Sequence, residues 1–217
     1  MQQTYTITQN KILSRVFLGL CASLVTAGAG VVVGTRLPYG LTPILWLVEL
    51  GMIIYAMFRQ YTRAIGYPFV FTFTFISGMT LSYALLSYAS VFGMGLVLKA
   101  LAVTAGAFLV ASFVASRTSM DFSFLGGFLM IGTLALLLMG LVAMFTGFSS
   151  AASLIYAYLG VAIFIGYVLF DVNRLAQYGV AEQHVPWMVL SLYLDFINLF
   201  LFILRLMGIM SGGNDRR

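Results

Sequence analysis

Residues 186–210 read PWMVLSLYLDFINLFLFILRLMGIM, an apolar stretch interrupted by two charged side chains, Asp195 and Arg205. At a rise of about 1.5 Å per residue, roughly 20 apolar residues cross the hydrocarbon core of a bilayer. The stretch is therefore long enough to span a membrane. Pro186 at its start is compatible with the first turn of a helix, where the missing N–H would be unpaired in any case.

Six further apolar stretches precede this one. The predicted spans are 16–35, 41–58, 68–89, 94–115, 122–146, 151–170 and 186–210. They use nearly the whole chain, so we expect one all-α transmembrane domain of seven helices over residues 1–217. Polar residues 1–15 before an apolar run are also typical of a cleaved signal peptide. Because the run continues to Val33 and six spans follow, we expect an uncleaved first helix.

The composition excludes most other protein classes. The chain is 62% hydrophobic and 8% charged, with a mean hydropathy of +1.04. Soluble domains contain about 25% charged residues, and disordered chains are polar. A single cysteine excludes a disulfide or cysteine–zinc scaffold. The net charge is +5, but the basic residues are spread singly, so we expect a lipid bilayer rather than nucleic acid as partner.

The basic residues in the short loops predict the orientation. With the N-terminus in the cytoplasm, the inside holds Lys11, Arg15, Arg59, Arg63, Arg117 and Arg174, and the outside holds Arg36, Lys99, Arg216 and Arg217. Because basic residues favour the cytoplasmic side, we expect the N-terminus inside, the C-terminus outside and a location in the cell membrane.

Two aspartates are placed by the spans in one region of the membrane. Asp171 follows the sixth span, and Asp195 lies about 13 Å into the seventh. The short connection predicts antiparallel neighbouring helices, which bring both carboxylates into the inner half of the bilayer. Two carboxylates in a poorly solvated site favour sharing one proton, which makes a pH sensor. When both are deprotonated, their oxygens suit calcium, so Asp171 and Asp195 are also a candidate calcium site.

Other polar residues would line the same region. On a helical wheel, Ser191, Asp195, Asn198 and Arg205 fall within about 80° of one another, and Gly160, Phe164, Tyr167 and Asp171 share a face of the sixth span. Glu49, in the middle of the second span, is a further candidate, with Arg205 or Arg59 as its partner. Charges inside a membrane are rare because they cost several kcal/mol, which favours function.

Structural explanations stay open for several of these residues. Asp171 lies at a span edge, where a solvated carboxylate costs little, and Glu49 could be a structural hydrogen-bond partner. Gly30 and Gly34 match the GxxxG pattern, which predicts close helix packing. The loops contain no phosphate-binding motif and no Cys/His ligand set, so we expect no cofactor beyond calcium as a permeant or bound ion.

Four segments carry a family resemblance: 191–208, SLYLDFINLFLFILRLMG; 66–73, GYPFVFTF; 121–125, DFSFL; and 169–171, LFD. They resemble the Bax inhibitor-1 family, also called the transmembrane Bax-inhibitor-motif family, and its bacterial members most, and residues 191–208 are the most specific of the four. The resemblance covers essentially the full chain. It implies six helices wrapped around a central seventh, and a pH-sensitive calcium leak across the membrane.

The resemblance also implies roles for particular residues. The family's aspartate pair, regarded as the pH sensor and gate latch, matches Asp171 and Asp195, and a glutamate of the second span matches Glu49. One position departs from the pattern. Where a bacterial calcium-leak member has an arginine that pairs with the aspartate of the sixth span, this chain has Gln60. Either Arg59 or Arg63 substitutes, or the latch is weaker.

Three functions are compatible with the sequence. The first is a passive calcium leak gated by protonation of the aspartate pair. The second is a regulatory role through helix-to-helix binding of another membrane protein. The third, an intramembrane aspartyl protease, also uses one aspartate on each of two adjacent helices. Its Gly-x-Gly-Asp motif is absent, since residues 192–195 read LYLD. We therefore expect no enzymatic activity. The sequence does not distinguish a channel from a slow exchanger.

Overall fold

The computed structural model describes residues 2–59 and 65–214, and every regular element in those ranges is helical. Seven of the described helices are long and apolar enough to cross a membrane, which confirms the predicted class. In chain order the elements are α1 (Gln2–Gly34), the short η1 (Tyr39–Leu41), α2 (Thr42–Arg59), α3 (Tyr67–Phe92), α4 (Met94–Arg117), α5 (Leu125–Thr146), α6 (Ser150–Tyr178), the short η2 (Glu182–His184) and α7 (Val185–Asn214).

Two helices, α1 and α6, extend furthest beyond the predicted apolar stretches. Helix α1 begins at Gln2, within the polar N-terminal segment. Helix α6 continues past Asp171 to Tyr178, and Gly179 follows with a φ of 67°, the left-handed conformation with which glycine commonly ends a helix. Asp171 therefore lies on a continuous helix, about two turns before its end, and not in a loop.

Backbone contacts divide the chain into two compact units. Unit 1 comprises Met1–Ser87 and Gly179–Tyr193, and so contains α1, α2, most of α3 and the start of α7. Helices α1 and α3 pack backbone to backbone, because Gly30 meets the Phe75 carbonyl and Gly78 meets the carbonyl of Ala27. A side chain at Gly34 would likewise overlap the backbone of Met79 on α3, so the GxxxG prediction of close packing is confirmed for both Gly30 and Gly34.

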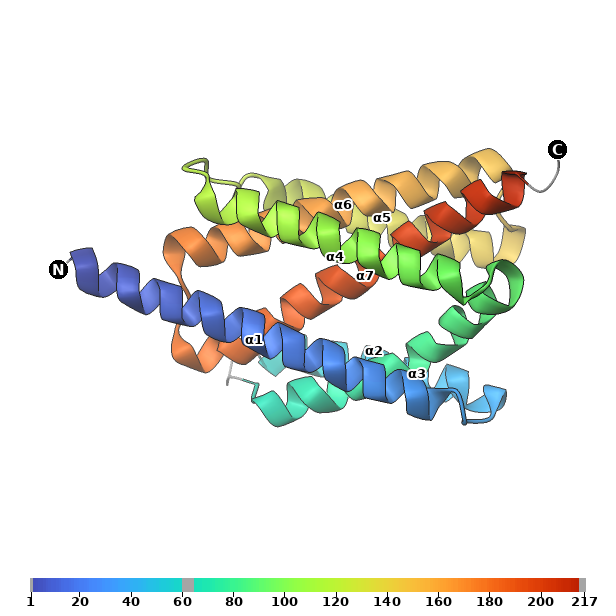
Figure 1. Ribbon diagram of the computed structural model, residues 1–217, viewed down its shortest axis with the longest axis horizontal. Helices are drawn as coiled ribbons and strands as arrows, with labels where there is room; N and C mark the ends of the chain where they lie inside the picture. The colour runs from blue at the N-terminus through green and yellow to red at the C-terminus, as the bar shows by residue number, and fades with distance from the viewer. Residues whose placement is uncertain (1, 60–64, 215–217) are drawn as a thin grey trace. The chain divides into compact units, whose positions relative to one another are not determined.

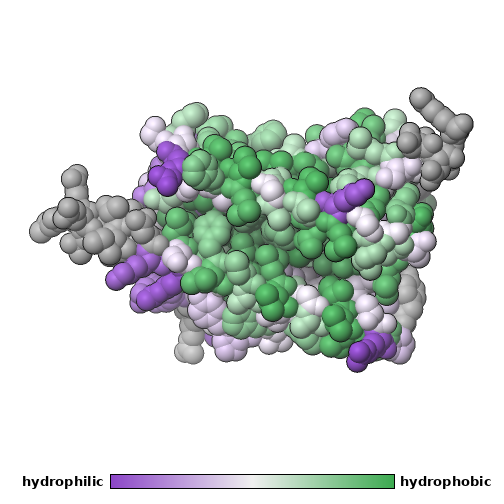
Figure 2. All heavy atoms as spheres, in the orientation of Figure 1, coloured by the Kyte–Doolittle hydropathy of each residue, from purple (hydrophilic) through white to green (hydrophobic). Residues whose placement is uncertain are grey.

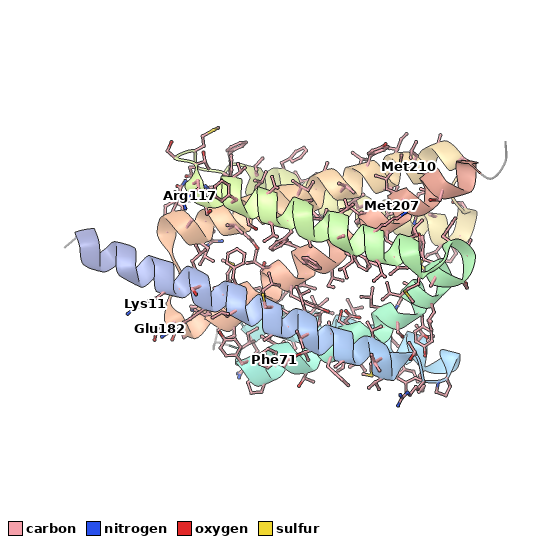
Figure 3. All side chains as sticks on the ribbon, in the orientation of Figure 1. Lys11, Phe71, Arg117, Glu182, Met207 and Met210 are labelled. Atoms are coloured by element: carbon pink, nitrogen blue, oxygen red, sulfur yellow. The ribbon has the colours of Figure 1, made fainter. Side chains whose placement is uncertain are left out.

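Two further contacts join α7 and the preceding η2 to α3 and α1 within unit 1. The ring of Tyr193 packs edge-on against that of Phe73, with 6.3 Å between centroids. At the end of α1 that carries Lys11, the Arg15 guanidinium forms a 2.6 Å ion pair with Glu182 of η2 (Figure 3). Both partners are exposed, so this pair adds at most about 1 kcal/mol.

Unit 2 comprises Tyr88–Tyr178 and Leu194–Arg217. Here α6 lies beside both α4 and α5 (Figure 1). The aromatic rings of Phe108 on α4 and Phe196 on α7 are 5.5 Å apart, and those of Phe164 on α6 and Phe202 on α7 are stacked at 5.7 Å. These contacts fix the second part of α7 between α4 and α6.

Helix α7 has the largest buried share of the seven spans, and α2 the smallest. The burial of α7 confirms the expectation that the C-terminal helix is central and packed by the others. Most other helices present apolar side chains outward, and Figure 2 shows a face on which hydrophobic residues predominate. Such a surface is stable in lipid and would be a liability in water.

Candidate functional site: the aspartate pair

Asp171 on α6 and Asp195 on α7 both belong to unit 2 and are both buried, with 7% and 5% of their surface exposed. Their carboxyl groups are close enough to interact electrostatically. The burial of Asp171 excludes the alternative that it is a solvated carboxylate at the membrane surface. The Oδ2 atom of Asp195 is buried and has no hydrogen-bond partner within the described ranges. A buried oxygen of this kind is a costly feature unless a proton or a cation satisfies it.

The face of α6 that carries Asp171 packs against α7 as the sequence pattern predicts. A side chain at Gly160 would overlap the ring of Phe202, so this glycine allows the two helices to approach. Phe164 stacks on the same ring one turn further along α6. Asp171 follows on this face, which explains how it comes to lie near Asp195.

Tyr167 lies one turn before Asp171 on α6 and interacts electrostatically with both aspartates. Its hydroxyl accepts a 3.2 Å hydrogen bond from the Thr133 hydroxyl of α5. That bond leaves the phenolic proton of Tyr167 available for another acceptor. The sequence pattern places Tyr167 on this face, but Thr133 carries no signal, because one threonine in an apolar helix is unremarkable.

Two residues of the predicted stripe on α7 have local partners. The Asn198 amide donates a 2.7 Å hydrogen bond to the Leu194 carbonyl of its own helix. Arg205 donates a 3.0 Å hydrogen bond to the Ser153 hydroxyl of α6, and its guanidinium lies 4.7 Å from the Phe148 ring and 4.9 Å from the Tyr156 ring. Arg205 is therefore held by aromatic faces and a hydroxyl group.

The structure places Glu49 in unit 1, whereas the aspartate pair lies in unit 2. Its neighbours are hydroxyl groups: Ser77 and Thr80 on α3, and Tyr193 on α7. Arg59, a proposed partner, lies over the Tyr55 ring of its own helix at 5.6 Å. Gln60 and Arg63, which bear on the latch suggested by the family resemblance, are outside the described residues.

Asn173 is a structural residue of this region that sequence reasoning missed. Its side chain is buried and bonds three backbone groups: it donates to the carbonyls of Ala115 at 3.1 Å and Met120 at 3.0 Å, and accepts from the Phe122 N–H at 3.0 Å. Gln177, one turn later, donates to the Met120 carbonyl at 2.7 Å. These bonds fasten the α4–α5 loop to the end of α6 that carries Asp171.

Asp121 lies in this loop, outside the helices. The side chain and backbone N–H of Ser123 and the hydroxyl of Tyr178 hydrogen-bond its carboxylate and hold the pKa of Asp121 below its usual range. At neutral pH this group is therefore charged.

Within the ranges described, no three His, Cys, Asp or Glu side chains gather as a metal-ligand set. A calcium ion held by Asp171 and Asp195 would need additional oxygens, which backbone carbonyls or water can supply. Two carboxylates nevertheless provide the charge that a divalent cation requires.

Comparison with known proteins identifies relatives along most of the chain. The chain is 32% identical to "Bax inhibitor 1" of Schizosaccharomyces pombe over 78% of its own length and 62% of that protein, so it spans less than two thirds of this relative. It is 29% identical to an uncharacterized membrane protein of Vibrio cholerae over 97% of this chain and 94% of the relative. An uncharacterized protein of Deinococcus radiodurans is 31% identical over 99% of this chain and 97% of the relative.

A family match also covers most of the chain. Residues 9–212 match the family described as "Inhibitor of apoptosis-promoting Bax1", which covers all seven spans. Together with seven apolar helices, this match agrees with the resemblance carried by residues 191–208. The chain is a multi-pass membrane protein of the Bax inhibitor-1 family.

Proposed function

We propose that this protein conducts calcium passively across the cell membrane and that protonation of Asp171 and Asp195 gates the leak. The observation that supports the proposal is the burial of both carboxylates within electrostatic range of each other in unit 2. Two such groups in a medium of low dielectric cannot easily both be ionised, so they exchange a proton with the solution as a pair.

The proposed cycle has two states. At higher pH both carboxylates are charged and hold a calcium ion or a basic side chain. At lower pH the pair takes up protons, the site loosens, and α2 moves. The low burial of α2 favours this helix as the moving element, because fewer buried contacts are lost when it shifts. The activity is transport down a gradient and involves no catalysis.

The test is calcium entry into liposomes that contain a calcium-sensitive dye, measured from pH 6 to pH 8. We expect a pH-dependent flux in the wild type, and a flux in Asp171→Asn and Asp195→Asn that no longer changes over this range. Asp121→Asn is the matched control, because it removes a carboxylate that lies outside the membrane spans. Unchanged flux and an unchanged pH profile in both aspartate variants would contradict the proposal.

The orientation is part of the same proposal. The positive-inside pattern supports a cytoplasmic N-terminus and an external C-terminus in the cell membrane. In that orientation Asp171 and Asp195 respond to cytoplasmic pH.

A second function, regulation of another membrane protein, is favoured by the name of one relative, "Bax inhibitor 1". A partner would bind through the apolar outer faces of the spans, since the loops are short. If the liposome experiment shows no flux above empty liposomes, affinity capture in mild detergent should recover a stoichiometric membrane-protein partner.

A further inference from the structure

Glu49 is a mid-membrane carboxyl group that has no basic partner within the described ranges. It lies on α2 about two turns after the helix begins at Thr42. Its interactions are with Ser77 and Thr80 of α3 and Tyr193 of α7, all in unit 1. Tyr193 is the titratable group that faces it, and no lysine, arginine or histidine of the described chain interacts with it. An isolated charge in such a place is strongly unfavourable.

The hydroxyl of Thr80 cannot donate a hydrogen bond to the Glu49 carboxyl group while it donates to its own helix. Thr80 Oγ1 donates its single proton to the Ile76 carbonyl of its own helix at 3.1 Å. A hydroxyl has only one proton to donate, so toward Glu49 this oxygen offers lone pairs. Two oxygens with lone pairs toward each other repel, unless a proton on the carboxyl group or a cation lies between them.

The remaining groups of the cluster are also oxygens. Ser77 is buried and within hydrogen-bonding reach of Glu49, and the Tyr193 hydroxyl lies against the Thr74 carbonyl oxygen at 3.5 Å. The cluster therefore offers one carboxylate, three hydroxyl groups and a carbonyl. Oxygen donors of this kind suit hard cations.

The single carboxylate of the cluster favours a ligand with a single positive charge. One carboxylate neutralises one positive charge, whereas a calcium ion would leave a net charge of about +1 inside the membrane, which is costly. Calcium sites in proteins normally supply several carboxylates. The aspartate pair of unit 2 has two carboxyl groups and the Glu49 cluster has one.

We propose that Glu49, Ser77, Thr80 and Tyr193 form a binding site for an exchangeable monovalent cation, either a sodium ion or a proton. The site is separate from the aspartate pair and does not depend on the calcium leak. It gives the protein a second ion-dependent state, set by the sodium concentration or the pH at α2.

The first experiment measures thermal unfolding of the full-length protein in detergent, with calcium chelated and sodium replaced by choline at constant ionic strength. For a bound sodium ion, each tenfold increase in sodium above its dissociation constant should raise the Tm by about 3–6 °C at pH 8.5. At pH 6 protons compete and the rise should be smaller. Glu49→Gln should abolish it, and Thr80→Val, which keeps the carboxyl group, should weaken it.

The second experiment detects a bound proton. Infrared difference spectra between pH 8.5 and pH 6 in choline should contain a carbonyl component from protonated Glu49, in addition to any component from the aspartate pair, and Glu49→Gln should remove that one component. A sodium response that depends on Glu49 assigns sodium, and the infrared band without a sodium response assigns the proton.

Two controls separate this site from other carboxylates. Glu182→Gln removes an exposed carboxylate of unit 1 and should leave both signals intact. Asp171→Asn should retain the sodium response and the Glu49 band even if the calcium leak is lost or is never observed. The proposal is overturned if wild type and Glu49→Gln give the same sodium response and the same spectra, or if Glu49 mediates a calcium response and no sodium response.

Discussion

At the scale of single residues, Asn173 makes the clearest contribution to stability. Replacement by leucine keeps the approximate volume but leaves the Ala115 carbonyl, the Met120 carbonyl and the Phe122 N–H without their side-chain partner. Unsatisfied buried polar groups cost about 1–3 kcal/mol each, and water can reach part of the loop, so we expect a loss of about 2–4 kcal/mol.

Thermal unfolding in detergent measures this loss. Gln177→Ala is the matched control, because it removes an exposed contact to the same loop and should lower the Tm much less. Equal Tm values for wild type and Asn173→Leu would show that the hydrogen bonds of Asn173 do not contribute to stability.

Arg205 tests the role of aromatic faces around a charge. Arg205→Lys preserves the charge but loses the planar group that lies over the Phe148 and Tyr156 rings. Cation–π contacts contribute about 0.5–2 kcal/mol, and arginine and lysine are not equivalent at stacked sites. We therefore expect both Arg205→Lys and Arg205→Gln to lower the Tm. A lysine variant as stable as the wild type would contradict the stacking explanation.

The lowered pKa of Asp121 predicts that acid reduces thermal stability, an effect separate from the proposed gating. Because hydrogen bonds lower the pKa of Asp121 in the folded state, its contribution to stability is present above the unfolded pKa of about 4 and is lost as the pH falls through the lower, folded value. Asp121→Asn should remove this part of the acid dependence of the Tm. The calcium flux profile between pH 6 and pH 8 should be unchanged, and a shifted profile would place Asp121 in the gate.

The residues of the site differ in how far the sequence predicts them. Asp171, Asp195 and Tyr167 follow from charge and helical spacing, because a membrane makes each charge conspicuous. Thr133 and Asn173 do not, because their partners are a distant side chain and backbone groups, which leave no periodic signal. The basic neighbours expected for Glu49 also illustrate the limit: charge suggests an opposite charge, whereas the described neighbours are hydroxyl groups.

At the scale of helices, α1 and α3 depend on glycine for their close approach. A Cβ atom at Gly78 would overlap the Ala27 carbonyl, so Gly78→Leu requires the two helices to separate. Gly28→Leu is the matched control on α1, because nothing lies within 4 Å of the added atom. We expect Gly78→Leu to abolish the cooperative thermal transition or lower its midpoint strongly, and Gly28→Leu to leave it unchanged. Similar transitions for both variants would show that close packing is dispensable.

The number of helices follows from hydropathy, but their ends do not. The length of an apolar run is set by the thickness of the bilayer. A helix instead continues until a residue such as glycine ends its regular backbone conformation. Helix α6 accordingly extends through Asp171 and Arg174 until Gly179, so the buried Asp171 lies within the helix and not at its end.

At the scale of the whole molecule, the orientation can be measured with cysteines. In a background without Cys21, Gly40→Cys reports the α1–α2 connection and Ser119→Cys reports the α4–α5 connection, and both positions are exposed. A membrane-impermeant maleimide should label Gly40→Cys in intact cells and Ser119→Cys only after permeabilisation. The reverse pattern would contradict a cytoplasmic N-terminus and would place the proposed pH sensor on the outside.

A single domain over residues 1–217 stays a prediction at this scale. Hydropathy finds spans one at a time and contains no information on which spans pack together. The grouping of α4, α5 and α6 with the second part of α7 arises from the fit of rings and glycines, such as Phe202 against Gly160, which only coordinates reveal.

The fastened α4–α5 loop has a practical consequence for protein engineering. Short hydrophilic connections between spans are the usual places to insert epitope tags or fluorescent reporters. Residues 118–124 look suitable, yet their backbone is fixed by Asn173 and Gln177 from a helix more than 50 residues later in the chain. A tag inserted there would break these bonds, so loss of expression in such a fusion would reflect misfolding and not the side of the membrane on which the loop lies.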